Sequence, residues 1–295
     1  MFNKKLFFLI LRWLRYVLEA CILLFGLVLF RILPLDIASC VGGYIARLIG
    51  PRMRADRIAE NNLKLALPAL SGAERSAILV NMWDNLGRGI GEYPHLPTSR
   101  FAQRVNIEGK EHIAALTASG QGGLFISGHF ANWEIGPLSA ALSERPMVVI
   151  YRAFNNPFSE WLLRCIREKY SLSLYSKGTI GAKETIKALK EGHIVAMLLD
   201  QKMNDGSPVP FFGQPAMTTT AAIAIATKLQ VPVLPVRMMR LKGARFKVVI
   251  HPPQLYDAQT NPVEAMTGIN KLFETWISEY PAQWLWVHNR WGKSK

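Results

Sequence analysis

The sequence lacks the short motifs that identify many common enzyme classes. It has no GxSxG nucleophile elbow, no HExxH zinc helix, no GxxxxGK(S/T) phosphate loop and no GxGxxG dinucleotide fingerprint. Its three cysteines, Cys21, Cys40 and Cys165, form no CxxC pair and have no metal-ligand spacing. We therefore expect neither a disulfide framework nor a resident metal, and the sequence predicts no cofactor.

Acidic residues are also scarce. The 295-residue chain has 21 Asp and Glu against 35 Lys and Arg, a formal net charge of +14, which favours an anionic partner. No recognition-helix, zinc-finger or RNP-type pattern supports nucleic acid, so we expect no nucleic-acid partner and favour anionic lipid. Because 50% of the residues are hydrophobic, a disordered or fibrous chain is excluded and a sizeable core is expected.

The N-terminus is the most apolar part of the chain. The uninterrupted apolar run, residues 20–30, is shorter than the ~20 residues that a membrane-spanning helix needs. Counted from Leu6 the stretch is long enough, but it then contains three charged residues: Arg12, Arg15 and Glu19. A tilted span, an interfacial helix and an ordinary buried helix all stay open, whereas the arginines disfavour a signal peptide. We interpret residues 1–35 as a membrane-anchor helix.

The rest of the chain, residues 36–295, has the pattern of one α/β domain. Helical spacing covers residues 55–92, and after Asn106 short apolar runs alternate with amphipathic stretches. The expected strands are 124–127, 147–151, 194–199, 231–236 and 246–250, and the expected helices between them are 133–142, 157–170, 180–191 and 219–229. This alternation predicts a mostly parallel central sheet flanked by helices, with the active site at the carboxyl ends of its strands.

One of these strand ends carries residue types that catalysis uses. The run 124–127 is followed by Gly128, which permits a tight turn, and then by His129, with Glu134 five residues further on. A histidine that acts as a base must be held in one tautomer, and a nearby carboxylate can do this. Asn132 is placed to cap the next helix. A catalytic pair is therefore one hypothesis for His129 and Glu134, and a structural histidine is the other.

Several ordered blocks extend the pattern over nearly the whole chain. They are the segment 129–134, the strand end 149–157, the segments 198–201 and 209–213, the strand 231–236 and the tryptophan-rich segment 281–291. With Asn85 and Glu92 in the first helical region, these blocks resemble the lipid A biosynthesis late acyltransferases (lauroyl and myristoyl transferases) of the wider glycerolipid acyltransferase superfamily.

The resemblance implies an activity and roles for individual residues. A fatty acyl group would pass from an acyl-carrier-protein thioester to a hydroxyl of a lipid A precursor like Kdo2-lipid IVA, at the cytoplasmic side of the inner membrane. His129 would remove the hydroxyl proton, and Glu134 would fix the histidine tautomer. Arg152 would stabilise the oxyanion or bind an acceptor phosphate. Asp200 would orient Arg152 or the acceptor hydroxyl, with a purely structural Arg152–Asp200 ion pair as the alternative.

Other features have two interpretations each. Phe212 and Gly213 would line an acyl slot or belong to the core. The tryptophans Trp284, Trp286 and Trp291 are either interface anchors or core residues. Segment 237–247, with five basic residues and no acid, would attract the acidic carrier protein or form an ordinary solvated hairpin near lipid phosphates. Two other functions stay open: a phosphatidylinositol-mannoside-type acyltransferase that uses acyl-CoA, and a non-catalytic lipid-binding protein of the same fold.

Overall fold

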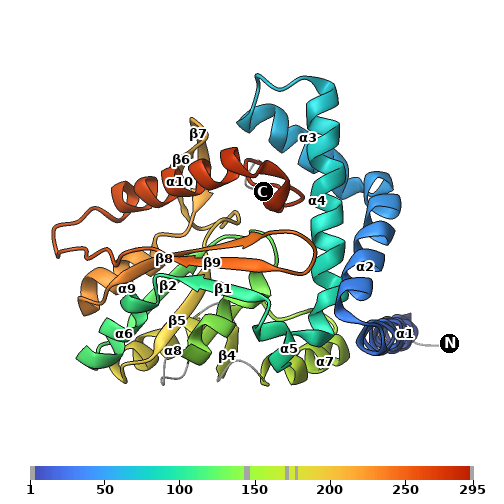
Figure 1. Cartoon of the computed structure of the whole chain (residues 1–295), viewed down its shortest axis with the longest axis horizontal. Helices are drawn as coiled ribbons and strands as arrows, with labels where there is room; N and C mark the ends of the chain where they lie inside the picture. The colour runs from blue at the N-terminus through green and yellow to red at the C-terminus, as the bar shows by residue number, and fades with distance from the viewer. Residues whose placement is uncertain (1–3, 143–146, 170–172, 177–178, 293–295) are drawn as a thin grey trace.

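A computed structural model describes residues 4–142, 147–169, 173–176 and 179–292 and confirms the α/β class (Figure 1). Seven strands form one sheet in the order β1-β9-β8-β2-β5-β3-β4. They are β1 (Val105–Glu108), β2 (Gly123–Ser127), β3 (Met147–Tyr151), β4 (Ser173–Ser176), β5 (Ile194–Leu198), β8 (Val233–Arg240) and β9 (Phe246–Ile250). All neighbouring pairs are parallel except the antiparallel pair β8–β9. The carboxyl ends of β2, β3 and β5 therefore meet at one edge of the sheet.

Strand β2 lies in the middle of this sheet, and all five of its residues are buried. A short run of apolar residues without alternation is typical of a strand that is covered on both faces. The two covering layers are separate hydrophobic clusters, one containing Leu124 and Ile126 and the other containing Phe125. This packing fixes the end of β2, from which the predicted catalytic segment begins.

Helices surround the sheet. The α-helices are α1 (Lys4–Ile32), α2 (Leu35–Ile49), α3 (Arg54–Ala66), α4 (Gly72–Glu92), α5 (Ser99–Ala102), α6 (Lys110–Ser119), α7 (Pro157–Arg167), α8 (Thr179–Lys190), α9 (Ala221–Leu229) and α10 (Pro262–Glu279). The 3-10 helices are η1 (Gly50–Arg52), η2 (Tyr93–His95), η3 (Trp133–Leu142) and η4 (Pro281–Gln283). The segment 133–142 was expected to be an α-helix, but Pro137 inside it has no N–H to donate, and the tighter 3-10 form results. Tyr170, the expected end of another helix, lies outside the described residues.

Helix α4 stands beside the sheet and supports the site from one side (Figure 1). It begins with a capping box, in which the Ser71 hydroxyl and the Glu74 carboxylate each accept from the other residue's backbone N–H. Helix α2 packs closely against α4, because a Cβ at Gly42 would lie only 2.3 Å from the carbonyl oxygen of Gly87. This close approach brings Glu92, at the end of α4, into the interior, where it is fully buried.

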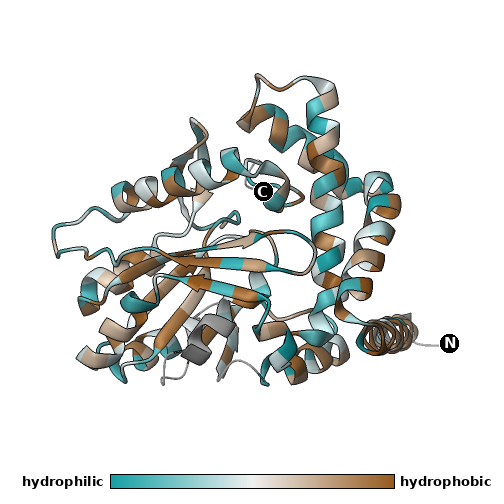
Figure 2. Ribbon diagram, in the orientation of Figure 1, coloured by the Kyte–Doolittle hydropathy of each residue, from teal (hydrophilic) through white to brown (hydrophobic). Residues whose placement is uncertain are grey.

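The N-terminal helix α1 has one large apolar surface. Its Phe7–Ile32 part is long and apolar enough to cross a membrane, by length and composition, and most of its large apolar side chains are exposed. Figure 2 shows this helix as predominantly hydrophobic, beside α2 and α7. The division of the chain into an anchor, residues 1–35, and a catalytic domain, residues 36–295, stays a prediction.

Candidate active site

His129 lies at the carboxyl end of β2, as the sequence predicts. Gly128 makes the turn possible, because a Cβ there would lie 2.9 Å from a carboxylate oxygen of Asp200. Ala131 completes the turn in the left-handed region, with φ of +50°, which is uncommon for a residue with a side chain. The loop then enters η3, leaving the imidazole only 14% exposed and facing an internal cavity.

The partner of His129 is Asp200, which follows β5. Oδ1 of Asp200 lies 2.7 Å from Nδ1 of the imidazole, and Oδ2 accepts the backbone N–H of His129, also at 2.7 Å. Trp284 donates its indole N–H to Oδ2 at 2.8 Å. Burial by itself would raise the pKa of Asp200, but the charge and hydrogen bonds of His129, with the Trp284 bond, outweigh it and lower that pKa to about 2.

This hydrogen bond defines the histidine tautomer. An ionised carboxylate only accepts hydrogen bonds, so Nδ1 carries the proton and Nε2 presents its lone pair. The side-chain amide nitrogen of Gln201 lies 3.2 Å from Nε2 and donates to it. Gln201, for which no role was predicted, therefore occupies the hydrogen-bonding position at Nε2.

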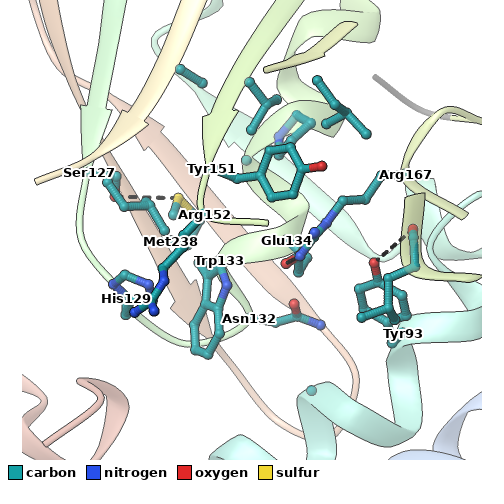
Figure 3. Close-up of a pocket in the computed structure, with 18 of the residues that line it drawn as sticks. Tyr93, Ser127, His129, Asn132, Trp133, Glu134, Tyr151, Arg152, Arg167 and Met238 are labelled. Carbon is teal, nitrogen blue, oxygen red and sulfur yellow. Dashed lines mark hydrogen bonds and ion pairs between the residues drawn. The ribbon is translucent and has the colours of Figure 1, made fainter. Parts of the chain in front are cut away.

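The predicted hydrogen bond between His129 and Glu134 is wrong for this structure. Both carboxylate oxygens of Glu134 accept from the guanidinium of Arg167, at 2.6 and 3.0 Å. The turn at Ala131 and the tight η3 helix carry Glu134 past the indole of Trp133, whose ring packs edge-on against His129 (Figure 3). Spacing along the chain placed the right residue types in one cavity but paired the wrong two.

Arg152 also lies in the cavity, at the end of β3. Figure 3 shows its side chain extending toward His129. The alternative Arg152–Asp200 ion pair is not formed among the described residues, because Asp200 instead binds His129 and Trp284. Arg152 therefore lines the same cavity as the imidazole.

The cavity has a volume of about 550 Å³, within the range of small-ligand pockets, about 300–1,000 Å³. His129, Gln201 and Arg152 line it together with mostly apolar side chains from the sheet, from α4, α7 and η3, and from α1. Phe212 and Gly213 do not line it. They form the two-residue turn between β6 (Ser207–Phe211) and β7 (Gln214–Thr218), with φ of +51° and +71°, a conformation typical of tight hairpins.

A buried ion pair behind the loop was missed by the sequence analysis. Glu92 and Arg240 form a two-pronged pair, one bond of which is 3.0 Å long, and Arg240 also donates to the side chain of Asn85 at 2.7 Å. Asn85 donates to the carbonyl of Ala131, and Asn132 donates to Glu92 at 2.9 Å and does not cap the next helix. The network therefore holds the loop that carries His129.

This pairing removes Arg240 from the basic surface expected of segment 237–247. Arg240 is 8% exposed and belongs to the interior. Two further cations of the segment are paired, Arg237 with Glu279 at 2.7 Å and Lys247 with Glu108 at 2.8 Å. Strand β8 continues past its apolar run into these arginines, whereas Lys242 and Arg245 are exposed at the turn that follows.

The closing segment belongs to the core as well. Trp284 and Trp286 are 2% and 0% exposed, so they are not interface anchors. Trp291 stacks on Phe211. The fully buried Arg290 lies over the same Phe211 ring. The segment thus supports Asp200 from behind through the indole of Trp284. Among the described residues, no group of three or more His, Cys, Asp or Glu is placed to hold a metal ion.

The structure thus combines an α/β fold with a carboxylate-oriented histidine at the wall of a mostly apolar cavity. The chain belongs to the bacterial lipid A biosynthesis acyltransferases, whose family model matches residues 6–293. It is therefore an acyltransferase of lipid A biosynthesis. This confirms the resemblance and disfavours both the phosphatidylinositol-mannoside-type enzyme and the non-catalytic protein.

Curated relatives agree with this assignment. A lipid A biosynthesis lauroyltransferase of Escherichia coli K12 is 28% identical over 246 residues, covering 80% of this chain and 79% of that protein. A palmitoleoyltransferase of lipid A biosynthesis from the same organism is 26% identical, covering 88% and 86%. A lipid A biosynthesis acyltransferase of Shigella flexneri has the same identity and coverage as the latter.

Proposed function

We propose that this protein transfers a fatty acyl group from an acyl-carrier-protein thioester to a hydroxyl of a lipid A precursor like Kdo2-lipid IVA. The reaction takes place at the cytoplasmic face of the inner membrane, with membrane lipid around α1. The observation that carries this proposal is the bond of His129 Nδ1 to Asp200 at the wall of an apolar cavity. It supplies a base of defined tautomer beside a space suited to a hydrocarbon chain.

The proton moves through His129. Nε2 accepts the proton of the acceptor hydroxyl, displacing the amide of Gln201, as the hydroxyl oxygen attacks the thioester carbonyl carbon. Asp200 stabilises the imidazolium that forms, and Arg152 stabilises the oxyanion. When the tetrahedral intermediate collapses, the C–S bond breaks and the imidazolium returns the proton to the departing sulfur. The products are the acylated lipid and the carrier-protein thiol.

The transfer is direct, without an acyl-enzyme. Ser127 is close in sequence to His129, but its hydroxyl contacts the carbonyl of Gly128 at 3.4 Å and the sulfur of Met238 at 3.8 Å. A serine nucleophile needs a base within hydrogen-bond reach to activate it. Neither contact supplies one, which supports attack by the acceptor hydroxyl itself.

Glu134 helps to hold one wall of the cavity in place. Its bidentate pair with Arg167 joins η3 to α7, and the Arg167 guanidinium lies 5.3 Å from the ring centre of Tyr151. We therefore assign Glu134 a positioning role for this wall and assign the orientation of His129 to Asp200.

The function is tested with the full-length protein in detergent or vesicles. The acceptor is Kdo2-lipid IVA, the donor is either the acyl-carrier-protein thioester or acyl-CoA, and mass spectrometry follows the lipid. We expect addition of one acyl group, with the carrier-protein thioester as the better donor. Transfer from acyl-CoA but not from the carrier-protein thioester would contradict the proposed donor. No acylation of the lipid with either donor would contradict the proposed function.

A further inference from the structure

The C-terminal half of helix α1 lies along the catalytic domain. The side-chain amide of Asn156, the N-cap of α7, donates to the Tyr16 carbonyl and to the Glu19 carboxylate, both at 2.9 Å. Fourteen residues after Tyr16, the Phe30 carbonyl lies 2.9 Å from Nε2 of His95. At 1.5 Å per residue these two contacts are about 21 Å apart along the helix. The contacts also explain the charged Glu19 in an otherwise apolar stretch.

The inward face of α1 reaches the active-site cavity. Leu23 and Leu27, one helical turn apart, line the same cavity as His129. The residues next to them point elsewhere: Ile22 is 64% exposed and Phe25 is 69% exposed. One helix thus has two apolar surfaces with different surroundings, a narrow one on the cavity and a broad one on the outside.

The cavity is suited to the donor's acyl chain. His129, Gln201 and Arg152 line it, and in the proposed mechanism the carbonyl under attack lies near Nε2 of His129. A chain bonded directly to that carbonyl enters the same space, where the surrounding side chains are mostly apolar. The length of chain that fits then depends on every wall of the cavity, including the wall that α1 supplies.

We propose that α1 is a specificity element as well as an anchor: Leu23 and Leu27 help to set the length of the acyl chain that the enzyme accepts. This inference rests on the proposed function, in which the cavity holds the donor chain. Filling the space beside either leucine removes room for methylene groups, and each methylene kept out of an apolar site costs about fourfold in binding. A bulkier residue therefore lowers kcat/KM for long chains and spares short ones.

The test compares substitutions on the two faces of α1 in the full-length protein. Leu23→Trp and Leu27→Trp fill the cavity, Leu27→Ala enlarges it, and Ile22→Trp and Phe25→Trp are matched controls on the exposed face. The measurement is kcat/KM for a series of saturated acyl-carrier-protein thioesters from octanoyl to palmitoyl. Flotation with phospholipid vesicles checks membrane binding.

We expect both cavity-face tryptophans to shift the preference toward shorter chains, with the ratio of long-chain to short-chain kcat/KM falling about tenfold, and Leu27→Ala to shift it toward longer chains. The controls keep the wild-type preference, and all variants bind vesicles alike. An unchanged preference in Leu27→Ala and in whichever cavity-face tryptophan variants fold, or an equal shift in the controls, overturns the inference. Absence of transfer by the wild-type protein would instead overturn the proposed function.

Discussion

Asp200 holds His129 at two atoms, its side-chain Nδ1 and its backbone nitrogen, each at 2.7 Å. The first bond sets the tautomer of the imidazole, and the second fixes the backbone from which the ring extends. Because Asp200 is 3% exposed and also receives the indole N–H of Trp284, it has little freedom to move. In the proposed mechanism the base is therefore oriented before substrate binds, so it needs no reorganisation during the reaction.

Replacing Asp200 should affect catalysis more than replacing Glu134. We expect Asp200→Asn to lower kcat about 10²–10⁴-fold, because the amide no longer stabilises the imidazolium. Glu134→Gln keeps a hydrogen-bond acceptor for Arg167 and should lower kcat less than about tenfold. Steady-state kinetics as a function of pH separates the two roles. A deeper loss of kcat in Glu134→Gln than in Asp200→Asn, with a changed pH profile, would restore Glu134 as the partner of His129.

Asp200 also predicts how stability depends on pH. Its pKa in the folded protein is lowered from the ordinary 3.8 to about 2, so the folded state binds fewer protons than the unfolded state between these values. The contribution, about 2 kcal/mol, is fully present above about pH 4 and is lost as the pH falls toward 2. Thermal unfolding of the wild type and Asp200→Asn should therefore differ less as the pH falls through this range. A difference independent of pH would contradict the lowered pKa.

Arg152 is expected to act on the oxyanion. Arg152→Ala should lower kcat about 10²–10³-fold, the usual loss when one oxyanion donor is removed. Arg152→Lys should recover part of this activity, because the charge is kept while the guanidinium geometry is lost. The alternative role, binding an acceptor phosphate, predicts a different result. Arg152→Ala would then raise KM for the acceptor, and this increase would disappear with an acceptor that lacks its phosphates. Kinetics with both forms of the acceptor distinguishes the two.

The pair of Glu92 and Arg240 should matter for stability. Arg240→Gln leaves Glu92 as a buried charge without its main partner and should lower the free energy of unfolding by about 3–5 kcal/mol. Lys247→Gln on the neighbouring strand breaks an exposed pair and should cost less than about 1 kcal/mol. Thermal unfolding in detergent measures both. Equal stability of the two variants, with a loss confined to carrier-protein use, would favour the surface role of segment 237–247.

Much of the sheet could be predicted from the sequence. Short apolar runs between amphipathic stretches locate β2, β3, β5, β8 and β9, and with them the strand end that carries His129. The β6–β7 hairpin could not be found in this way, because prolines interrupt both strands and their exposed residues break the apolar pattern. The burial of Arg240 could not be predicted either, because β8 continues beyond its apolar part.

The partner of His129 could be predicted only with knowledge of the order of the strands in the sheet. Asp200 is 71 residues away in sequence, and no local spacing connects the two. The register of the sheet does: Ser127 at the end of β2 lies opposite Leu198 at the end of β5, so residues two positions beyond each strand become neighbours. The signal available in the sequence for this pairing was a polar residue two positions after each of two apolar strands, His129 after β2 and Asp200 after β5. Glu134 was preferred because it is near in sequence and because the segment 129–134 resembles a block of the family.

The role of His129 as general base is tested most directly by the transfer activity of His129→Ala in the full-length protein. The matched control is His112→Ala on α6, a partly exposed histidine outside the cavity. We expect a loss of about 10²–10⁴-fold in His129→Ala and a wild-type rate in the control, with both variants melting as folded proteins. A rate for His129→Ala within about threefold of the wild type would contradict the role of His129 as general base.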